Sequence, residues 1–375
     1  MYLVKNVDLY APAHRGVVDI LMIGGVFAAI GPGLAPGIEG ITEVDGAGCA
    51  AVPGFIDQHT HLTGGGGEGG FDTRTPQLEL SQTVRAGVTS LVGLLGTDSF
   101  THDVESLVAK TKELKKGGLS AWCLTGAYQY PSITVTGSVT KDIVYIEEVI
   151  GCKLAIADHR CSLPTCAEIT RLAADIRMAS LIAGKPGVLH LHVGASKKGM
   201  EDIFRILRDT DLPAWHFRPT HMEGHPEQAV EFTRLGGYAD VTAEPEEAAS
   251  FCKLARQAAP GMLTLSSDAG GSIPKWNDKR EIIGVGVGGM DTLWQTVGAL
   301  VREHGIPLEQ ALCYITENVA KALRMYPRKG CVQIGSDADL VLLDEAGAPH
   351  TVFARGKAMM LSGKVLARGL FEPGE

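Results

Sequence analysis

Residues 54–71 read GFIDQHTHLTGGGGEGGF, a short apolar run with two histidines that leads into four glycines and a lone glutamate. Side chains on a strand alternate between its two faces, so His59 and His61 share one face if this run is a strand. The glycines at 64–67 permit almost any backbone path, at an entropic cost that an ordinary loop does not require. The stretch therefore predicts a strand that presents two histidines, followed by a loop in which the position of Glu68 matters.

From residue 52 onward, short apolar runs alternate with amphipathic helical patterns. The strand candidates are residues 54–62, 89–96, 120–128, 153–159, 188–194, 216–222, 238–243 and 263–269. The clearest helix candidates are residues 104–118, 166–184, 201–209 and 227–237. Eight such strands over about 270 residues are typical of an α/β fold of the closed (β/α)8 TIM barrel type. A doubly wound open sheet is the alternative, but no strand candidate is followed by G-x-G-x-x-G, which disfavours its dinucleotide-binding version.

The two ends of the chain differ from the middle, since residues 2–30 and 331–366 are short β-type runs separated by Gly, Pro and Asp. Neither end has enough strands to be stable alone, but paired together they would make one small β-sandwich beside the barrel. We therefore expect a composite β-sandwich domain of residues 1–51 and 330–375, and a barrel domain of residues 52–329. Independent flexible tails are the alternative, which the apolar alternation at both ends disfavours.

The net charge of the chain and the spacing of its cysteines disfavour some classes of partner and location. The formal net charge of −9 disfavours nucleic acid or an anionic membrane as a partner. The most apolar stretch, residues 20–30, is too short to span a bilayer, and the N-terminal residues lack the pattern of a signal peptide. The eight cysteines include no C-x-x-C pair, which is typical of reduced thiols. We expect a cytoplasmic protein.

Metal-binding side chains lie at or near the C-terminal ends of several strand candidates, where a barrel of this type has its active site. They are His59, His61, His192, His221 and Asp268. Each of them alone is more often an ordinary core or surface residue. Imidazole nitrogens and a carboxylate at one level of a barrel are, however, the ligands of zinc or a similar divalent cation. The pattern therefore predicts a metal centre.

Lys153, in the fourth strand candidate, has two interpretations. As the first residue of the strand it would extend to solvent at the bottom of the barrel. Alternatively, it would face inward with Ala155 and Ala157, which leave room at the barrel centre. A lysine amine near two cations loses its proton readily and can add carbon dioxide, which gives an anionic carbamate able to bridge two metal ions.

Motifs along essentially the whole chain carry a family resemblance. The pattern PGFIDQHTH at 53–61, the strand-four lysine, the two later histidines and the strand-eight aspartate resemble the amidohydrolase superfamily with a binuclear centre. An ordered series of motifs further resembles the isoaspartyl (β-aspartyl) dipeptidases: HTHLTGGGGEGG at 59–70, TGAYQYPS at 125–132, KLAIADHR at 153–160, HVGASKK at 192–198, PTH at 219–221 and LSSDAGGS at 265–272. So many motifs in this order are specific to that family.

The resemblance implies a zinc-dependent dipeptidase with two Zn²⁺ per subunit. The ligands it implies are His59, His61 and Asp268 for the first ion, His192 and His221 for the second, and a CO₂-derived carbamate on Lys153 as the bridge. A hydroxide shared by the metals would attack the β-aspartyl amide carbonyl, with Asp268 as base and then as acid. Tyr128 resembles the tyrosine that donates to the carbonyl oxygen as charge develops, and simple packing at the barrel rim is its alternative.

The resemblance also implies how a dipeptide substrate is held. Glu68, with Ser272, would bind the free α-ammonium group, and Arg160 would pair with an α-carboxylate in the bidentate geometry that guanidinium favours. The alternative for Glu68 is a solvated loop charge, which the neighbouring glycines disfavour. The glycine run of the opening stretch would then let the backbone approach the substrate.

One position departs from the family pattern. In this family, an arginine usually stands three residues after the strand-six histidine and binds the carboxylate of the leaving residue. Here Gly224 takes that place, preceded by Glu223. In one interpretation, Arg218 or another cation takes the place of that arginine, and ordinary isoaspartyl dipeptides are the substrates. In the other, the loop has been remodelled for a particular leaving residue. In the second case, Glu223 would favour a cationic leaving residue, as in β-Asp-Arg or β-Asp-Lys.

Two other functions compete with the dipeptidase. A cyclic-amide hydrolase of the dihydroorotase or hydantoinase type would use the same metals without needing Glu68 in a glycine loop or Tyr128. A non-catalytic scaffold on the same barrel is the other alternative, but such proteins typically lose metal ligands. The resemblance also implies a symmetric homo-oligomer.

The remaining expectations concern a loop and the other histidines. Residues 274–289 are long for a barrel loop, and we expect them to close as a lid over bound dipeptide. His190 is expected one layer below His192. The histidines expected near the rim, where they could line the pocket, are His159, His216 and His225, and those expected at the surface are His14, His102, His304 and His350.

Overall fold

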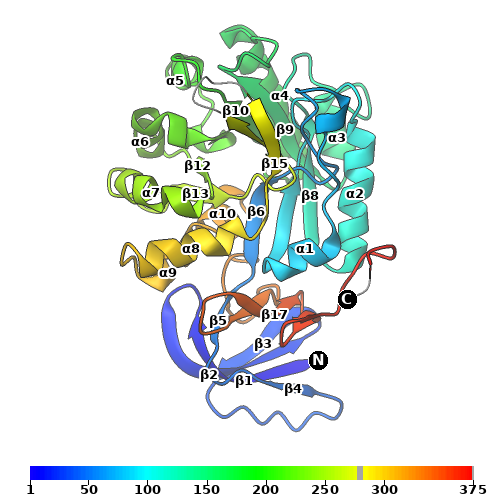
Figure 1. The fold of residues 1–375 in the computed structure, drawn as a ribbon, viewed down its shortest axis with the longest axis vertical. Coiled ribbons are helices and arrows are strands. Elements are labelled where there is room, and N and C mark those ends of the chain that lie inside the picture. Colours follow the sequence, from blue (N-terminus) through cyan, green and yellow to red (C-terminus); the bar gives the residue numbers. More distant parts are fainter. Residues whose placement is uncertain (277–281, 374–375) are drawn as a thin grey trace.

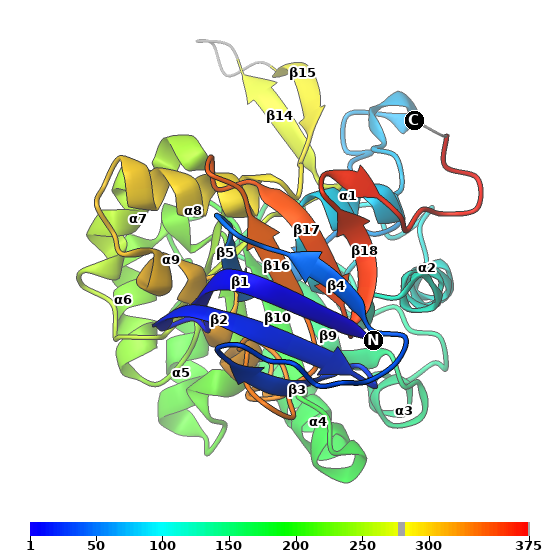
Figure 2. The same ribbon diagram turned by 90° about the horizontal axis from the view of Figure 1, so that it is seen from below.

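The computed structural model describes residues 1–276 and 282–373. Figure 1 shows an α/β barrel, with helices on both sides of its strands, above a β-sheet that is built from strands near both ends of the chain. From below, this sheet lies across the end of the barrel (Figure 2). The α/β class expected from the sequence is therefore found.

In the described residues, six parallel strands form one sheet in chain order, β6-β7-β8-β9-β10-β11. Their bounds are β6 Phe55–Thr60, β7 Val88–Gly93, β8 Ser120–Gly126, β9 Val149–Ile156, β10 Val188–Val193 and β11 Phe217–Thr220. Two further strands, β12 Ala239–Thr242 and β13 Leu263–Ser266, pair in parallel with each other. β12 contacts β11, and β13 contacts β6, where Thr60 forms a parallel bridge with Ala269. The strands thus follow one another around a TIM-barrel-like arrangement.

Helices alternate with these strands on the outside of the barrel. The α-helices are α1 Leu80–Arg85, α2 Val104–Gly117, α3 Val139–Tyr145, α4 Cys166–Ala183, α5 Glu201–Asp209, α6 Pro226–Arg234, α7 Ala248–Ala255, α8 Thr292–Arg302, α9 Leu308–Cys313 and α10 Glu317–Ala322. Short 3-10 helices are η1 Phe71–Thr73, η2 Ala214–His216, η3 Met222–Gly224 and η4 Pro245–Glu247. Local signals set their ends: the Asp103 carboxylate accepts from Ser106 N at 2.7 Å at the start of α2, and Gly118 follows its last residue. All four helix candidates from the sequence are confirmed.

Strand β9 differs most from its candidate. It begins at Val149 rather than at residue 153, and it ends at Ile156 because Ala157 has a φ of 57°, outside the strand region. Lys153 therefore lies inside the strand, where it is fully buried. The interpretation in which Lys153 begins a strand and extends to solvent is wrong.

Both chain ends enter one mixed sheet of nine strands in the part of the chain that the structure describes. Its strands are β1 Tyr2–Tyr10, β2 His14–Ile23, β3 Val26–Gly31, β4 Thr42–Asp45, β5 Ala50–Pro53, β16 Leu340–Leu343, β17 Pro349–Ala354, β18 Lys357–Leu361 and β19 Lys364–Val365. The two ends join where β5 pairs antiparallel with β16, with Val52 opposite Val341. An apolar cluster that includes Phe27 and Phe353 covers this sheet. The two-layer sandwich and the domain boundaries stay predictions.

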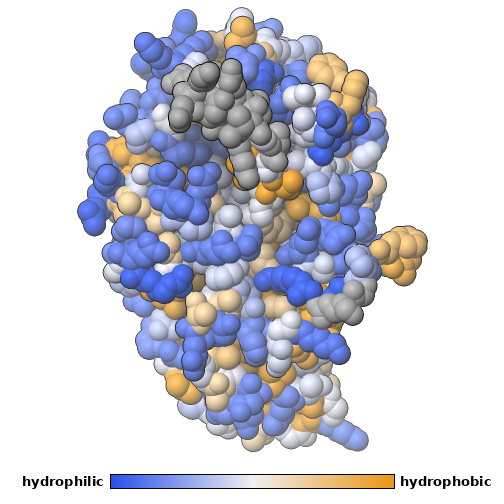
Figure 3. Space-filling view, viewed as in Figure 1, coloured by the Kyte–Doolittle hydropathy of each residue, from blue (hydrophilic) through white to orange (hydrophobic). Residues whose placement is uncertain are grey.

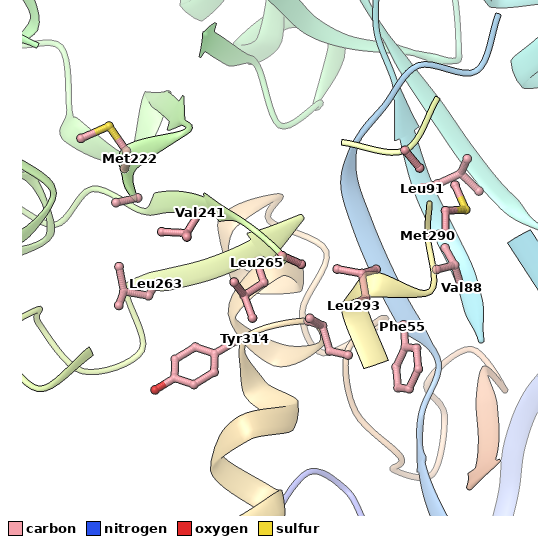
Figure 4. Packing of buried hydrophobic residues seen from close by; sticks show 14 of the residues in the cluster. Phe55, Val88, Leu91, Met222, Val241, Leu263, Leu265, Met290, Leu293 and Tyr314 are labelled. Atoms are coloured by element: carbon pink, nitrogen blue, oxygen red, sulfur yellow. The ribbon is translucent and has the colours of Figure 1, made fainter. Parts of the chain in front are cut away.

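The main core lies between the barrel strands and the helices. In Figure 4, Leu263 and Leu265 of β13 lie on the same side as Val241 of β12 and Tyr314, with Leu293 further toward Phe55, and all six are buried. Each such aliphatic side chain stabilises the fold by roughly 1.5–3 kcal/mol. On the face shown in Figure 3, hydrophilic residues predominate and hydrophobic ones are scattered between them. Among the described helices, none combines the length and apolarity that a bilayer crossing requires.

The segment expected to be a long lid loop is partly regular. β14 Ser272–Trp276 and β15 Ile282–Val287 pair antiparallel, and the hairpin projects from the barrel (Figure 2). Residues 277–281 lie outside the described residues, so that part of the expectation has no structural counterpart here. Closure over a substrate stays a prediction.

Candidate metal centre and active site

Three of the predicted metal ligands meet at the carboxyl end of β6. The Nε2 atoms of His59 and His61 lie 3.1 and 3.0 Å from Oδ1 of Asp268. One ligand atom from each of the three residues lies within 4.8 Å of the others. Burial favours the neutral acid, but the neighbouring imidazoles of His59 and His61 hold the Asp268 pKa well below its usual range. The cluster is therefore an anionic carboxylate faced by two imidazoles.

The other two predicted histidine ligands join this cluster. The ring centroid of His221 lies 5.2 Å from that of His59 and 4.7 Å from that of His192. His221 and Asp268 each adopt a left-handed backbone, with φ of 61° and 53°, just after β11 and β13. This conformation is unfavourable for residues other than glycine, and such backbone strain is common at functional sites.

Lys153 lies beside the histidine cluster. Its Nζ is buried, has no hydrogen-bond partner among the described residues, and lies 6.0 Å from the ring centroid of Tyr128. Burial lowers the pKa of Lys153 to about 7, against the attraction of Asp268 and Asp240. An unpartnered buried ammonium is unfavourable, whereas a neutral amine can react with carbon dioxide. The orphaned nitrogen therefore fits a group that carries a metal-bridging carbamate.

The donor set fits a binuclear centre. Imidazole nitrogens, one carboxylate and a lysine able to carry a carbamate are all ligands that zinc takes. The set comprises His59, His61, Lys153, His192, His221 and Asp268, all of which the structure brings together. A cation would also relieve the buried lone pairs that face one another there.

His192 is held at both ring nitrogens. Its Nε2 lies 2.8 Å from Oδ2 of Asp158, and its Nδ1 lies 2.8 Å from the hydroxyl of Tyr128. Burial lowers the pKa of His192 to about 3, and burial also raises the pKa of Tyr128. Tyr128 thus stays a neutral O–H donor directed into the cluster, as its predicted role requires.

Asp158 was not singled out from the sequence, although it stands just after the fourth strand in the motif KLAIADHR. It accepts from Arg160 Nε at 3.0 Å and from Arg160 Nη2 at 2.8 Å. Burial opposes its charge, but hydrogen bonds from His192 and Arg160 keep the Asp158 pKa well below its ordinary value. A charged residue that directly follows a barrel strand is the signal that could have found it.

Three of the five predicted substrate-binding residues, Glu68, Arg160 and Ser272, also come together. Glu68 Oε1 accepts from Ser272 Oγ at 2.9 Å and lies 3.3 Å from Arg160 Nη1. The Arg160 guanidinium is therefore shared between Glu68 and Asp158 rather than free. The side chains of Glu68 and Arg160 are 24% and 28% exposed.

A cavity of about 560 Å³ opens beside the cluster. Its walls include Asp158, Arg160, His192, His221, Glu223 and Gly224. His159 and His225 line it as expected, whereas His216 does not: its Nε2 lies 2.8 Å from the Ala173 carbonyl, and the residue precedes β11 at the opposite end of the barrel. The rim position expected for His216 is wrong, because strand six begins after it.

Two residues proposed to recognise the leaving residue are placed differently. Glu223 faces the cavity, and its carboxylate accepts from Thr242 Oγ1 at 2.9 Å and Thr242 N at 3.2 Å. Arg218 is fully buried and donates to the Ala322 carbonyl at 2.6 Å, with its guanidinium 5.1 Å from the ring of Tyr238. Arg218 thus lies away from the cavity, and we do not propose it as a substrate ligand.

A second layer of buried carboxylates supports the strand ends, and the sequence did not indicate it. Asp57 accepts from the backbone N–H groups of His59 and Ser267 at 3.2 and 3.3 Å. Burial raises the Asp57 pKa to about 7. Deeper in the barrel, Asp240 accepts from the side chains of Gln58, Thr220, Thr264 and Ser266. His190 also lies in this layer, with Nε2 3.2 Å from His59 Nδ1, as expected.

A crystal structure of the β-aspartyl dipeptidase from Fervidobacterium islandicum AW-1, in complex with a β-Asp-Leu dipeptide, is 38% identical to this chain over 97% of both chains, with a TM-score of 0.92. The chain belongs to the β-aspartyl dipeptidases of the amidohydrolase superfamily. A second structure of the enzyme from that organism is 37% identical, with a TM-score of 0.89, over 97% of this chain and 98% of the other. The resemblance seen in the motifs is confirmed.

This β-aspartyl dipeptidase family member has more distant relatives as well. Residues 262–359 match the amidohydrolase family model. The L-hydantoinase of Paenarthrobacter aurescens is 24% identical over 405 residues, which cover 91% of this chain and 85% of that protein. The dihydropyrimidinase of Brevibacillus agri NCHU1002 is 18% identical with a TM-score of 0.67, over 98% of this chain and 96% of the other, and shares the fold. The TIM-barrel-like fold is thereby confirmed.

Proposed function

We propose that this protein hydrolyses the β-aspartyl amide bond of dipeptides. The observation that best supports this function is the 38% identity over 97% of both chains with a β-aspartyl dipeptidase solved with β-Asp-Leu. The grouping of Glu68, Arg160 and Ser272 beside the histidine cluster gives independent support, because it offers complementary charges to a zwitterionic substrate.

The cofactors that we propose are two Zn²⁺ ions and a CO₂-derived carbamate on Lys153. His59, His61 and Asp268 would hold one ion, His192 and His221 the other, and Lys153 would bridge them. When bound, zinc supplies an activated water and polarises the amide carbonyl. The orphaned Lys153 nitrogen is the feature that supports the bridge.

Asp268 and Tyr128 would act on the reacting atoms. Asp268 would take a proton from the attacking water and return it to the amide nitrogen that leaves, so one carboxylate would serve as base and then as acid. The Tyr128 hydroxyl, which burial keeps protonated, would donate to the carbonyl oxygen as negative charge develops.

The remaining side chains would bind the aspartyl part of the substrate. The carboxylate of Glu68, held by Ser272, would face the α-ammonium group, and Arg160 would pair with the α-carboxylate. Asp158 already occupies two nitrogens of Arg160, which fixes the orientation of the guanidinium before the substrate arrives.

For the leaving residue, we propose a preference for cationic side chains, as in β-Asp-Arg and β-Asp-Lys. Glu223 and Gly224 line the cavity, and Gly224 leaves open space where a side chain would otherwise reach. Glu223 is 41% exposed, which permits a further cationic partner. Equal kcat/KM for β-Asp-Arg and β-Asp-Leu would remove this preference and leave the peptidase assignment intact.

The test of the main proposal combines metal analysis with a substrate panel. The purified protein should contain about two zinc ions per chain and hydrolyse β-aspartyl dipeptides faster than dihydroorotate or hydantoins. The L-hydantoinase match makes cyclic-amide hydrolysis the alternative, and the reverse order of rates would support it. Less than one metal ion per chain together with no hydrolysis would instead support a non-catalytic scaffold. We also propose a symmetric homo-oligomer and a cytoplasmic location, for which sedimentation and cell fractionation are the tests.

A further inference from the structure

Two of the metal-facing histidines are held by the same arrangement of side chains. In the first, His59 Nδ1 lies 3.2 Å from Thr220 Oγ1, and the Thr220 hydroxyl donates to Asp240 Oδ2 at 2.8 Å. Asp240 is fully buried, and three other donors, from Gln58, Thr264 and Ser266, converge on its oxygens.

The second arrangement lies at the rim, one strand further on. His221 Nδ1 lies 2.9 Å from Thr242 Oγ1, and the Thr242 hydroxyl donates to Glu223 Oε1 at 2.9 Å. The Thr242 backbone N–H donates to the other oxygen of Glu223, at 3.2 Å. The two threonines end consecutive strands, β11 and β12.

The number of hydrogens in each arrangement fixes the histidine tautomer. A threonine hydroxyl has one hydrogen, and an ionised carboxylate can only accept. When that hydrogen goes to Asp240 or Glu223, the threonine oxygen is left to accept from the imidazole. Nδ1 of the histidine must then carry the hydrogen, and its Nε2 keeps a lone pair. His59 Nδ1 also lies 3.2 Å from His190 Nε2, and in this tautomer His190 Nε2 must be an acceptor.

The consequence is clearest at His59. Its Nε2 lies 3.1 Å from Asp268 Oδ1, so a lone pair faces a carboxylate oxygen across a hydrogen-bond distance. Two acceptors at that separation repel each other unless a cation lies between them. The Nδ1–H tautomer therefore prepares the site for a metal ion instead of for a histidine–aspartate hydrogen bond.

We infer that Thr220 with Asp240, and Thr242 with Glu223, are positioning pairs that hold His59 and His221 in the Nδ1–H tautomer with Nε2 directed at the metal centre. The inference rests on the proposed metal-dependent function and deepens it. Partners of this kind fix ring orientation, and their loss typically weakens metal binding by about 10- to 100-fold. Glu223 thereby has a role that does not involve the leaving residue.

The test compares Thr220→Val and Thr242→Val with Thr220→Ser and Thr242→Ser. Valine keeps the shape but removes the hydroxyl, whereas serine keeps it. Zinc affinity, measured by chelator competition, should fall roughly 10- to 100-fold in each valine variant and stay within about threefold of wild type in each serine variant. Thr111→Val is the matched control, because Thr111 is a buried threonine of α2 whose hydroxyl donates to the Leu107 carbonyl, and its zinc affinity should not change.

A second readout separates positioning from structural damage. In ¹⁵N-histidine-labelled protein, His59 and His221 should show the Nδ1–H tautomer in the wild type and lose its dominance in the corresponding valine variants. Valine variants with wild-type zinc affinity, or wild-type spectra with the Nε2–H tautomer at these residues, would overturn the inference. A wild-type protein that neither binds zinc nor hydrolyses dipeptides would instead overturn the proposed function.

Discussion

The carboxylate of Glu68 lies 3.3 Å from the guanidinium of Arg160, although 92 positions separate the two residues in the chain. The glycine-rich loop after β6 thus places the carboxylate of Glu68 next to the guanidinium of Arg160, which follows β9. The pair brings a negative and a positive group to the edge of the histidine cluster, where a zwitterionic substrate could replace their mutual contact.

Glu68→Gln tests the recognition of the α-ammonium group. Because the amide is nearly isosteric but uncharged, kcat/KM for a β-aspartyl dipeptide should fall by about 10²-fold, mainly through KM. An N-acetylated dipeptide lacks the ammonium, so the variant and the wild type should cleave it equally slowly. Asp72→Asn, an exposed acid on the same loop, is the control and should change neither rate. An equal loss on both substrates would contradict the assignment.

Lys153→Ala tests the bridging carbamate. Loss of an anionic bridge should reduce metal content and lower kcat by on the order of 10³-fold. Added short carboxylic acids, such as acetate, should restore part of the activity and the metal, because they can occupy the vacated space as bidentate anions. Lys116→Ala removes an exposed lysine of α2 and should behave as wild type. Full metal content and activity in Lys153→Ala would exclude the bridge.

Tyr128→Phe tests hydrogen bonding to the developing oxyanion. Removing one such donor typically lowers kcat by about 10²- to 10³-fold with little change in KM. Since Tyr128 contacts His192 through its hydroxyl, zinc content must be measured in the same preparation. A fall of less than about threefold in kcat at full zinc occupancy would return Tyr128 to a packing role.

His216 should contribute to acid unfolding independently of the active site. Its burial lowers its pKa to about 4, whereas an unfolded histidine titrates near 6.5. The unfolded chain therefore binds this proton first, so the contribution of His216 to stability is full above pH 6.5 and is lost as the pH falls toward 4. The loss amounts to about 3 kcal/mol by pH 4.

The measurement is denaturant unfolding of wild type and His216→Gln between pH 4 and 8. The difference in unfolding free energy between the two proteins should be constant above pH 7 and shift in favour of the variant on acidification. Parallel curves for wild type and His216→Gln would contradict the shift.

The convergence of His59, His61 and Asp268 could be predicted because the topology of a parallel barrel brings all strand ends to one face. The start of β9 could not, because the candidate strand began at Lys153 and a glycine inside a strand, such as Gly151, is a weak local signal. In the structure a Cβ at Gly151 would lie 2.1 Å from the Val188 carbonyl oxygen, so the glycine permits close approach of β9 and β10. The part played by Thr220 was also hidden, since a threonine 161 positions from His59 gives no local signal of contact.

The pairing of β5 with β16 sets the order in which the molecule can be completed during synthesis. Val52 leaves the ribosome early, but its partner Val341 follows only after the entire barrel. At about 5–20 residues per second, the edge of β5 waits unpaired for roughly 15–60 s. An unpaired edge strand is a template for association with other chains. A message truncated before residue 340 would therefore yield a nascent product prone to aggregate, even if every metal ligand had already been translated.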